Sequence, residues 1–242
     1  MEIRICENSA ALGKSAAKEA AIALRDCISK QGYARLALST GASQFDTLAA
    51  LVKEDVDWSK VEMFHLDEYV DLPITHPASF RLYLQTRFVD LLPTPLKAVH
   101  FVDGTKEGIA QLTEDIRRLP IDVGLIGIGE NSHIAFNDPP ADFDTKEAYI
   151  VVDLDERCKK QQMGEGWFPT LDDVPKQAVS MTVHQILSCK KIISCVPHSV
   201  KAWAICQTLK QPVSNTYPAT ILRTHPDWTL YIDMNSAADI LK

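Results

Sequence analysis

Residues 121–126 read IDVGLI, and residues 127–140, which follow directly, read GIGENSHIAFNDPP. The apolar run is typical of a buried strand. Glycines, a histidine, asparagines, an aspartate and two prolines follow it, so the chain places polar groups there instead of more core. In open α/β sheets, ligand sites lie at the carboxyl ends of the strands. This stretch therefore indicates an α/β fold with a functional loop at the end of one strand.

Outward from this strand in both directions, strand-like apolar runs alternate with helical patterns. The expected strands are residues 3–6, 35–39, 61–66, 99–102, 121–126, 149–154, 191–196 and 229–233. The expected helices are residues 9–30, 44–53, 78–91, 106–119 and 199–209, with an apolar stripe of Phe80, Tyr83, Leu84, Phe88 and Leu91 along the third. The alternation predicts a single Rossmann-like α/β domain over residues 1–242, with a mostly parallel central sheet flanked by helices.

Residues 155–175 interrupt this alternation. They are polar and charged, and they carry the sequence Gly-Glu-Gly-Trp at residues 164–167. This composition predicts a mobile flap over residues 155–175 rather than a core element.

The bulk composition is that of an ordinary globular protein. Of the 242 residues, 46% are hydrophobic and 24% are charged, with a net charge of −7. The acidic balance argues against a nucleic-acid partner, and no apolar run approaches the ~20 residues of a membrane span. The amino terminus lacks the apolar core of a signal peptide, and the six cysteines form no CxxC pair. A cytoplasmic protein with reduced thiols is therefore expected.

Polar groups follow a strand again at residues 39–44 (STGASQ), which connect an expected strand to an expected helix. Glycine lets backbone N–H groups face inward, and hydroxyls at a helix start suit a phosphate or a carboxylate. The alternative is a plain turn in which Ser43 caps the helix. The loop is not a P-loop, because no Gly-Lys-Ser/Thr follows.

Two carboxylates, Asp67 and Glu68, follow the strand at residues 61–66. They are solvated loop charges in one interpretation. In the other, Asp67 points into a cleft and acts as a base, because a carboxylate shielded from water has a raised pKa and exchanges a proton with carbon.

His133 lies in the opening stretch, with Asn131 and Asp138 close by in sequence. A carboxylate bonded to one imidazole nitrogen fixes the tautomer and leaves the other nitrogen free to shuttle a proton. A purely structural histidine is the alternative. The Gly127-Ile128-Gly129 start resembles a dinucleotide fingerprint, but Ser132 replaces the third glycine, which excludes NAD binding. One histidine without a matching cysteine or second histidine makes a metal site improbable.

A fourth strand end is residues 196–201 (VPHSVK). Lys201 is either an exposed helix lysine or a cation that reaches back to an anion held at residues 40–43.

These motifs together identify the chain as similar to the glucosamine-6-phosphate deaminase (isomerase) family, a branch of the fold shared with 6-phosphogluconolactonases. The resemblance runs from about residue 36 to residue 233. It rests on LDEYV at residues 66–70, HPASF at 76–80, the HIAFN core of residues 129–139, VP at 174–175, PATIL at 218–222 and HP at 225–226.

The resemblance implies a reaction without a metal or an organic cofactor. Asp67 aligns with the base that moves a proton between C2 and C1 of the opened sugar, and His133 with the group that opens the ring. Asn131 and Asp138 align with the partners that orient this histidine. The implied phosphate-binding residues are Thr40, Gly41, Ala42, Ser43 and Lys201, and Glu68 and Gly129 are further substrate-binding candidates.

The implied partner is a small amino-sugar phosphate, with glucosamine 6-phosphate converted to fructose 6-phosphate and ammonia. Alternatives are galactosamine 6-phosphate, a lactonase, whose family has Asp-Glu-Arg where this chain has Asp67-Glu68-Tyr69, and a non-catalytic sugar-phosphate sensor. The protein is expected to be a monomer or a homo-oligomer.

The chain departs from the family's pattern at several positions. Asn131 replaces an aspartate found in some members, and Ala42-Ser43-Gln44 lacks the common Thr-Pro. Asp138 replaces a typical glutamate, so its oxygens are expected to lie about an ångström further from His133 unless the loop shifts. The flap's usual phosphate-binding arginine has no counterpart: Glu165 and Gly166 fall near its place, and Arg157, Lys159 and Lys160 are candidate replacements. The short carboxyl end predicts weak or absent allosteric control.

Overall fold

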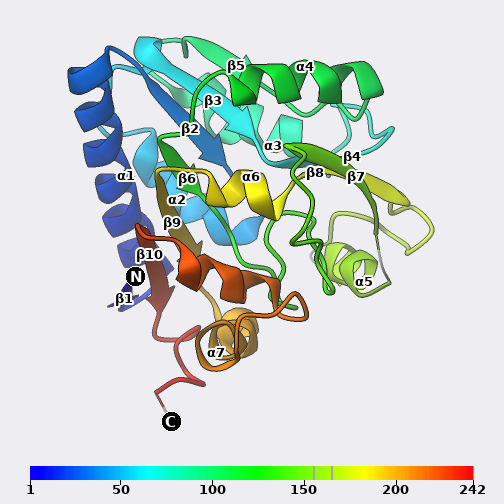
Figure 1. Cartoon of the computed structure of the whole chain (residues 1–242). Coiled ribbons are helices and arrows are strands. Elements are labelled where there is room, and N and C mark those ends of the chain that lie inside the picture. Colours follow the sequence, from blue (N-terminus) through cyan, green and yellow to red (C-terminus); the bar gives the residue numbers. More distant parts are fainter. Residues whose placement is uncertain (155, 165, 242) are drawn as a thin grey trace.

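A seven-stranded parallel sheet forms the centre of the protein (Figure 1). The structure is a computed structural model that describes residues 1–154, 156–164 and 166–241, and the side chains of residues 106, 157, 158 and 161 lie outside the described set. The strand order is β1-β10-β9-β6-β2-β3-β5. The bounds are β1 Glu2–Cys6, β2 Ala34–Leu38, β3 Val61–His65, β5 Ala98–His100, β6 Val123–Leu125, β9 Lys191–Val196 and β10 Trp228–Asp233.

The chain reverses its direction of growth across the sheet between β2 and β6. From β2 it adds β3 and β5 on one side, then returns to place β6 on the other side of β2 and continues with β9 and β10. A crevice opens at such a reversal, because the connections on either side leave in opposite directions. The predicted mostly parallel sheet is confirmed, and β2 and β6 mark where a ligand site is expected.

Two layers of helices cover the two faces of the sheet (Figure 1). Leu36 and Leu38 of β2 pack into the core beneath α1, α2 and α3, whereas Ala37 packs into the core beneath α4, α6 and α7. This alternation is the pattern expected of a strand buried on both faces. The bounds are α1 Ser9–Gln31, α2 Phe45–Leu51, α3 Phe80–Arg87, α4 Lys106–Arg117, α6 Val183–Leu187 and α7 Ala202–Lys210.

The third predicted helix is shorter than expected. It ends at Arg87, and Val89–Leu91 form a 3-10 turn. Leu91 is 57% exposed, although the other members of its predicted stripe are buried. The helical period ends at Phe88, whose backbone leaves the helical region with φ −133°, so Leu91 no longer faces the core.

A second sheet of three antiparallel strands lies beside the first, in the order β4-β8-β7. The strands are β4 Asp67–Tyr69, β8 Gln177–Met181 and β7 Tyr149–Asp153. The sequence predicted β7 but neither of the other two, because β4 is only three residues long. This small sheet matters for the site because Asp67 pairs with Ser180 across it.

The segment predicted as a flap contains a helix, α5 Glu156–Gly164. Beyond the helix, Phe168 and Val174 are buried in a small apolar cluster with Tyr69 and Phe80. The segment therefore contributes buried side chains to a small core beside β4, and its mobility as a flap stays a prediction. Glu165, one of the positions compared with the family's arginine, lies outside the described residues.

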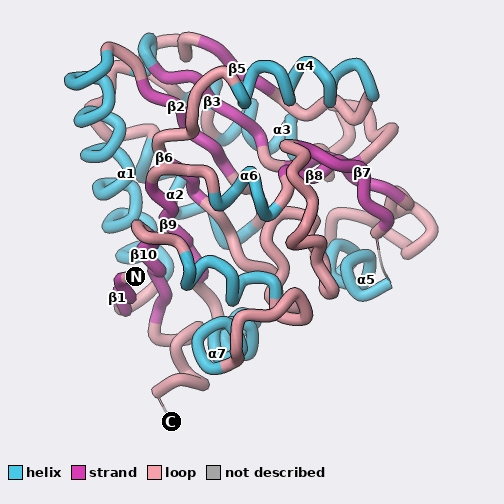
Figure 2. The backbone as a smooth tube through the Cα atoms, viewed as in Figure 1, coloured by secondary structure: helices cyan, strands magenta, loops and turns pink. Residues whose placement is uncertain are grey.

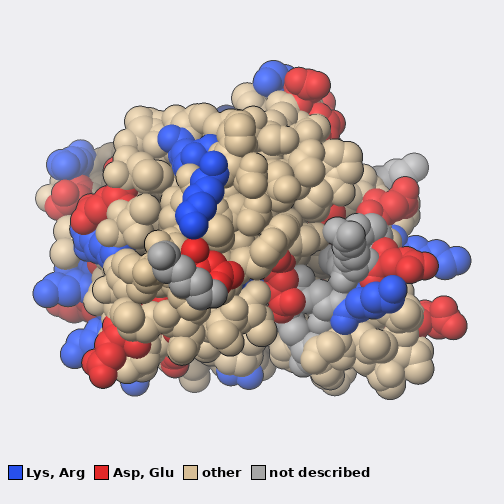
Figure 3. Space-filling view, turned by 90° about the horizontal axis from the view of Figure 1, so that it is seen from below, with Lys and Arg blue, Asp and Glu red and all other residues tan. Residues whose placement is uncertain are grey.

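Loops gather at the carboxyl ends of the strands, between α5 and α7 (Figure 2). Seen from below, the surface carries interspersed acidic and basic side chains (Figure 3). Among the described residues, no helix combines the length and the apolar character that crossing a membrane requires.

Candidate active site

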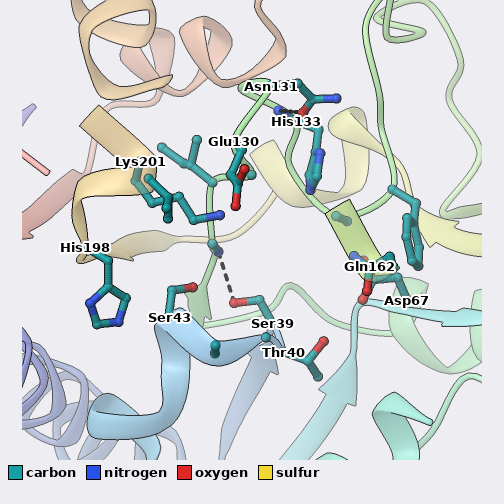
Figure 4. Close-up of a pocket in the computed structure, with 18 of the residues that line it drawn as sticks. Ser39, Thr40, Ser43, Asp67, Glu130, Asn131, His133, Gln162, His198 and Lys201 are labelled. Atoms are coloured by element: carbon teal, nitrogen blue, oxygen red, sulfur yellow. Dashed lines mark hydrogen bonds between the residues drawn. The ribbon is translucent and has the colours of Figure 1, made fainter. Parts of the chain in front are cut away.

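A cavity of about 840 Å³ opens at the carboxyl ends of β9, β6, β2 and β3, four neighbouring strands of the sheet. Its lining comes from every strand end that the sequence singled out, and from α5 (Figure 4). The predicted site residues in the lining are Thr40, Gly41, Ala42, Ser43, Asp67, Gly129, Asn131, His133 and Lys201. The structure thus brings together residues that lie up to 161 positions apart in the chain.

The loop after β2 is fixed by hydrogen bonds from three other elements. The hydroxyl of Ser39 accepts from the backbone N–H of Gly127 at 3.0 Å, which joins the two loops at the reversal point of the sheet. The Tyr83 hydroxyl donates to the carbonyl of Gly41 at 2.9 Å, and the Gln44 amide donates to the carbonyl of Cys195 at 3.0 Å. These contacts hold the loop as a preformed wall of the cavity.

Ser43 does not cap α2. Gln44 occupies the N-cap position without a side-chain capping bond, and a 3-10 turn at Ala42–Gln44 precedes the helix. The plain-turn interpretation is therefore wrong, and the Ser43 hydroxyl lies in the cavity wall.

Lys201 is only 7% exposed and lines the cavity. It ends a 3-10 turn, Ser199–Lys201, that follows β9. Figure 4 shows its side chain directed into the cavity on the side of Ser39 and Ser43. The exposed-lysine interpretation is wrong, and this cation lies on the same side of the cavity as the loop at residues 40–43.

Asp67 is 6% exposed and faces the cavity from the start of β4. Burial and, to a lesser extent, the neighbouring charge of Glu68 together raise the pKa of its carboxyl group to about 8. A carboxyl group with this pKa exchanges protons near neutral pH, as a general base requires. The solvated-loop interpretation is wrong for this residue.

Glu68 lies outside the cavity lining and is fully buried. Its carboxylate accepts hydrogen bonds from the Ser79 hydroxyl at 2.7 Å, from the backbone N–H of Arg81 at 2.9 Å and from the Arg81 guanidinium at 3.2 Å. The negative charge thus sits at the amino terminus of α3, where the helix dipole favours it. In place of the predicted substrate contact, the structure gives Glu68 the role of anchoring α3 to β4.

His133 and Asp138 lie in ion-pair contact, with 3.1 Å between Nδ1 and Oδ1. Asn131 donates to the same aspartate oxygen at 2.9 Å and accepts from the backbone N–H of His133 at 3.1 Å. The expectation that Asp138 falls short of the histidine is wrong. The loop between the two residues contains left-handed backbone at Ser132 (φ 72°) and Ala135 (φ 48°).

Gly129 packs directly beneath the imidazole ring. A Cβ atom at this position would lie 2.2 Å from both Cε1 and Nε2 of His133. Any side chain here would therefore push the ring out of the cavity, so Gly129 acts by making room for the histidine.

Gly129→Ala is expected to lower kcat on the order of 10²-fold, because the displaced imidazole loses its alignment with Asp138 and the cavity. Gly164→Ala is the matched control, since a Cβ there meets nothing within 4 Å in the wall of the same cavity. The measurement is turnover of both variants on one substrate. Equal activities would show that His133 does not depend on the space above Gly129.

The sequence did not single out several residues of the lining. Gln162 and Gly164 reach the cavity from α5, and His198, Val200 and Trp203 reach it from the segment after β9. Lys160, one of the candidate cations, also lines the cavity, whereas the side chain of Arg157 lies outside the described residues. The helix at residues 156–164 was not predicted, because its sequence is mostly polar and lacks the apolar stripe by which a helix is recognised.

Within the described part of the chain, no group of three or more His, Cys, Asp or Glu side chains is arranged to hold a metal ion. The polar groups of the cavity are instead a buried carboxyl group, an oriented imidazole and a lysine beside a hydroxyl-bearing loop. Such a set suits proton transfer on a small anion.

An open parallel sheet with an acid–base cavity at its reversal point defines an α/β enzyme that acts on a small substrate. The chain belongs to the family of glucosamine-6-phosphate isomerases and 6-phosphogluconolactonases, whose family model matches residues 7–231.

Two relatives in this family are named glucosamine-6-phosphate deaminases. A glucosamine-6-phosphate deaminase of Staphylococcus epidermidis (strain ATCC 12228 / FDA PCI 1200) is 38% identical over 224 residues, which is 88% of this chain and 90% of the relative. A glucosamine-6-phosphate deaminase of Shouchella clausii (strain KSM-K16) is 33% identical over 230 residues, covering 91% and 92% of the two chains.

Solved structures agree on the fold. The structure of a monomeric glucosamine-6-phosphate deaminase has a TM-score of 0.88 at 28% identity, covering 99% of this chain and 100% of the other. A 6-phosphogluconolactonase structure from Neisseria gonorrhoeae has a TM-score of 0.75 at 20% identity, with 96% and 98% covered, and shares the fold.

Proposed function

We propose that this protein converts glucosamine 6-phosphate and water to fructose 6-phosphate and ammonia. The observation that carries the proposal is a single cavity in which the buried Asp67 carboxyl group and the Asp138-paired His133 face a loop suited to phosphate. Relatives that cover about nine-tenths of the chain and are named glucosamine-6-phosphate deaminases support the same reaction.

The phosphate group is held at the end of the cavity formed by residues 40–43 and Lys201. Backbone N–H groups and hydroxyls of the loop donate to the phosphate oxygens, and the lysine supplies the positive charge. With the phosphate anchored there, the remainder of the sugar extends toward His133 and Asp67, which lie on the far side in Figure 4.

His133 opens the pyranose ring. Its imidazole takes the proton of the anomeric hydroxyl and delivers a proton to the ring oxygen of the sugar. Asp138 stabilises the imidazolium cation that forms between these two transfers. The product of this step is the open aldehyde, with a carbonyl at C1.

Asp67 then isomerises the open sugar. The C2–H bond breaks, the proton goes to the carboxylate, and the electron pair forms a C1=C2 double bond. The same carboxyl group returns the proton to C1, and the nitrogen lone pair forms a C2=N double bond. A proton from the nitrogen goes to the C1 oxygen, which leaves a hydroxyl at C1 and an imine at C2. Water hydrolyses the imine to the ketone and releases ammonia, so atoms and charge balance without a further reactant.

The test is ammonia release from glucosamine 6-phosphate and from galactosamine 6-phosphate, with 6-phosphogluconolactone in a pH-stat assay as the control for hydrolase activity. Ammonia from the first sugar, at a kcat/KM above that for the second, supports the proposal. Release of acid from the lactone without ammonia from either sugar would replace it by a lactonase. Lactone hydrolysis uses no base for a carbon-bound proton, and the buried Asp67 carboxyl group would then have no task.

The pH dependence of kcat/KM is expected to report Asp67. The base must be ionised, and its pKa is raised to about 8, so activity should be low at pH 6 and rise through pH 8. The measurement is kcat/KM from pH 5.5 to 9.5. Binding of fructose 6-phosphate to Asp67→Asn, followed by calorimetry over the same range, serves as the control and should lack this transition. An acid limb near pH 4 would contradict the assignment.

A monomeric state is part of this proposal, supported by the structural match to a monomeric deaminase over 99% of the chain. Light scattering after size exclusion tests it, since a mass near 26.9 kDa is expected.

A further inference from the structure

Gln162 is a polar residue of the cavity lining to which the proposed reaction assigns no role. It projects from α5, is only 6% exposed and lines the cavity. Asp67 lines the same cavity, and Figure 4 shows both side chains on the side of the cavity away from Lys201. A polar side chain this buried normally satisfies its hydrogen bonds within the protein.

The amide of Gln162 has a fixed orientation. Its Oε1 accepts a hydrogen bond from the Tyr69 hydroxyl at 2.7 Å. Tyr69 is itself fully buried, and its ring contacts those of Phe80, Phe136 and Phe168 at centroid distances of 5.1, 5.3 and 5.4 Å. Because this cluster holds the tyrosine, the amide oxygen is fixed and the NH₂ group must point elsewhere.

The NH₂ group has no acceptor among the described residues, although the side chain lines the cavity. The Nε2 atom is not among the fully buried polar atoms without a partner, so the NH₂ group is open to the cavity. The arrangement is therefore that of a donor oriented in advance toward a ligand in the cavity.

We propose that Gln162 is a further catalytic residue, whose amide N–H groups donate hydrogen bonds to the oxygen at C1 of the opened sugar. The inference rests on the proposed deaminase reaction. Asp67 must reach both C2 and C1, and the oxygen is bonded to C1, so this oxygen lies close to the Asp67 carboxyl group in the cavity that Gln162 also lines.

The chemistry at this oxygen calls for a donor. When Asp67 takes the proton from C2, the electron pair of the C–H bond moves into the C1=C2 bond and the carbonyl electrons move onto the C1 oxygen. Hydrogen-bond donors oriented toward a developing oxyanion lower such a barrier, and removal of one typically costs about 10²- to 10³-fold in kcat. His133 and Lys201 are engaged at the ring oxygen and the phosphate, respectively.

The test compares Gln162→Met with wild type and with Met163→Ala. Methionine matches glutamine in length and lacks the donor, and Met163 is a 37% exposed neighbour on the same helix that serves as the control. Gln162→Met is expected to lower kcat for ammonia release on the order of 10²-fold with KM nearly unchanged. The melting temperature should fall by a few degrees, because the substitution also removes the acceptor of the Tyr69 hydroxyl. Met163→Ala is expected to behave as wild type.

Exchange of the C2 proton with solvent separates a catalytic role from a structural one. In D₂O, Gln162→Met should slow C2 exchange as much as ammonia release, because both require the oxyanion. Wild-type kcat in Gln162→Met, a loss seen only in KM or in the melting temperature, or undiminished exchange would each overturn the inference. Absence of ammonia with the wild-type protein would instead defeat the proposed function itself.

Gln162→Glu tests the position of residue 162 through the pH dependence of kcat/KM, which a change in packing alone would not shift. A carboxylate beside Asp67 places two like charges together, which raises the pKa of the pair further. The acid limb of kcat/KM should therefore shift to higher pH in Gln162→Glu and stay in place in Gln162→Met. An unshifted limb in Gln162→Glu would place residue 162 away from Asp67 and contradict the proposal.

Discussion

Asp67→Asn is expected to abolish deamination, with kcat lowered by as much as about 10⁴-fold. Asparagine has the shape of aspartate but cannot accept a proton from carbon at these pH values. The measurement is ammonia release together with C2 proton exchange, both of which must disappear. Ser59→Ala, an exposed change far from the cavity lining, is the control for expression and handling.

The same substitution is expected to stabilise the fold at alkaline pH. The folded pKa of Asp67 lies above its usual value of 3.8, at about 8, so folding disfavours the ionised form. Well below the unfolded pKa of 3.8 the carboxyl group is protonated in both states and imposes no penalty, and at pH 4 the penalty is still small. The penalty grows as the pH rises and is complete above pH 8.

Asparagine carries no such penalty, so the melting temperature of Asp67→Asn should exceed that of wild type by roughly 5 °C or more at pH 8.5. At pH 4 the two proteins should melt at nearly the same temperature. Scanning calorimetry at both pH values checks this. A variant that is inactive and also less stable than wild type at pH 8.5 would contradict this prediction. It would indicate that the ionised Asp67 carboxylate has a stabilising partner in the folded protein.

The site residues that could be predicted from the sequence are those at the carboxyl ends of the strands. Parallel strands share one carboxyl edge, so polar residues after residues 35–39, 61–66, 121–126 and 191–196 had to meet once the sheet formed. The pattern also predicted the mostly parallel sheet, since long apolar strands separated by amphipathic helices have few other arrangements.

The small antiparallel sheet was not predictable in this way. β4 holds Asp67 in place, yet it spans only three residues and directly follows β3, so its residues appear as a continuation of one strand. Its identity depends on pairing with β8, which lies over 100 positions later in the chain. A contact of this range leaves no local periodicity.

Gln162 was missed for a related reason. Its meaning depends on Tyr69, which is 93 positions away and supplies the hydrogen bond that orients the amide. In the sequence, Gln162 is one polar residue within a polar segment, and no local pattern distinguishes it from its neighbours. Asp138 shows the opposite error: the shorter side chain was visible, but the left-handed backbone at Ser132 and Ala135 was not, because those residues adopt positive φ without being glycine.

His133→Gln is expected to lower kcat for glucosamine 6-phosphate by about 10²- to 10⁴-fold, through ring opening alone. Glutamine is polar and fits in the space above Gly129, but its amide cannot carry a proton between two oxygens. Asp138→Asn should reproduce a smaller part of the loss. Combined with His133→Gln it should add almost nothing, because the carboxylate acts only through the imidazole.

An open-chain substrate separates the two proton transfers. A 2-ketose 6-phosphate that lacks the 5-hydroxyl cannot close a furanose ring, so it needs no ring opening. In D₂O containing ammonium, exchange of its C1 proton should persist in His133→Gln and vanish in Asp67→Asn. If His133→Gln loses this exchange as fully as Asp67→Asn, the histidine takes part in isomerisation and the division of labour is wrong. If exchange persists, the pair held at 3.1 Å between Nδ1 and Oδ1 acts on the closed sugar, and the carboxyl group of β4 acts on the open one.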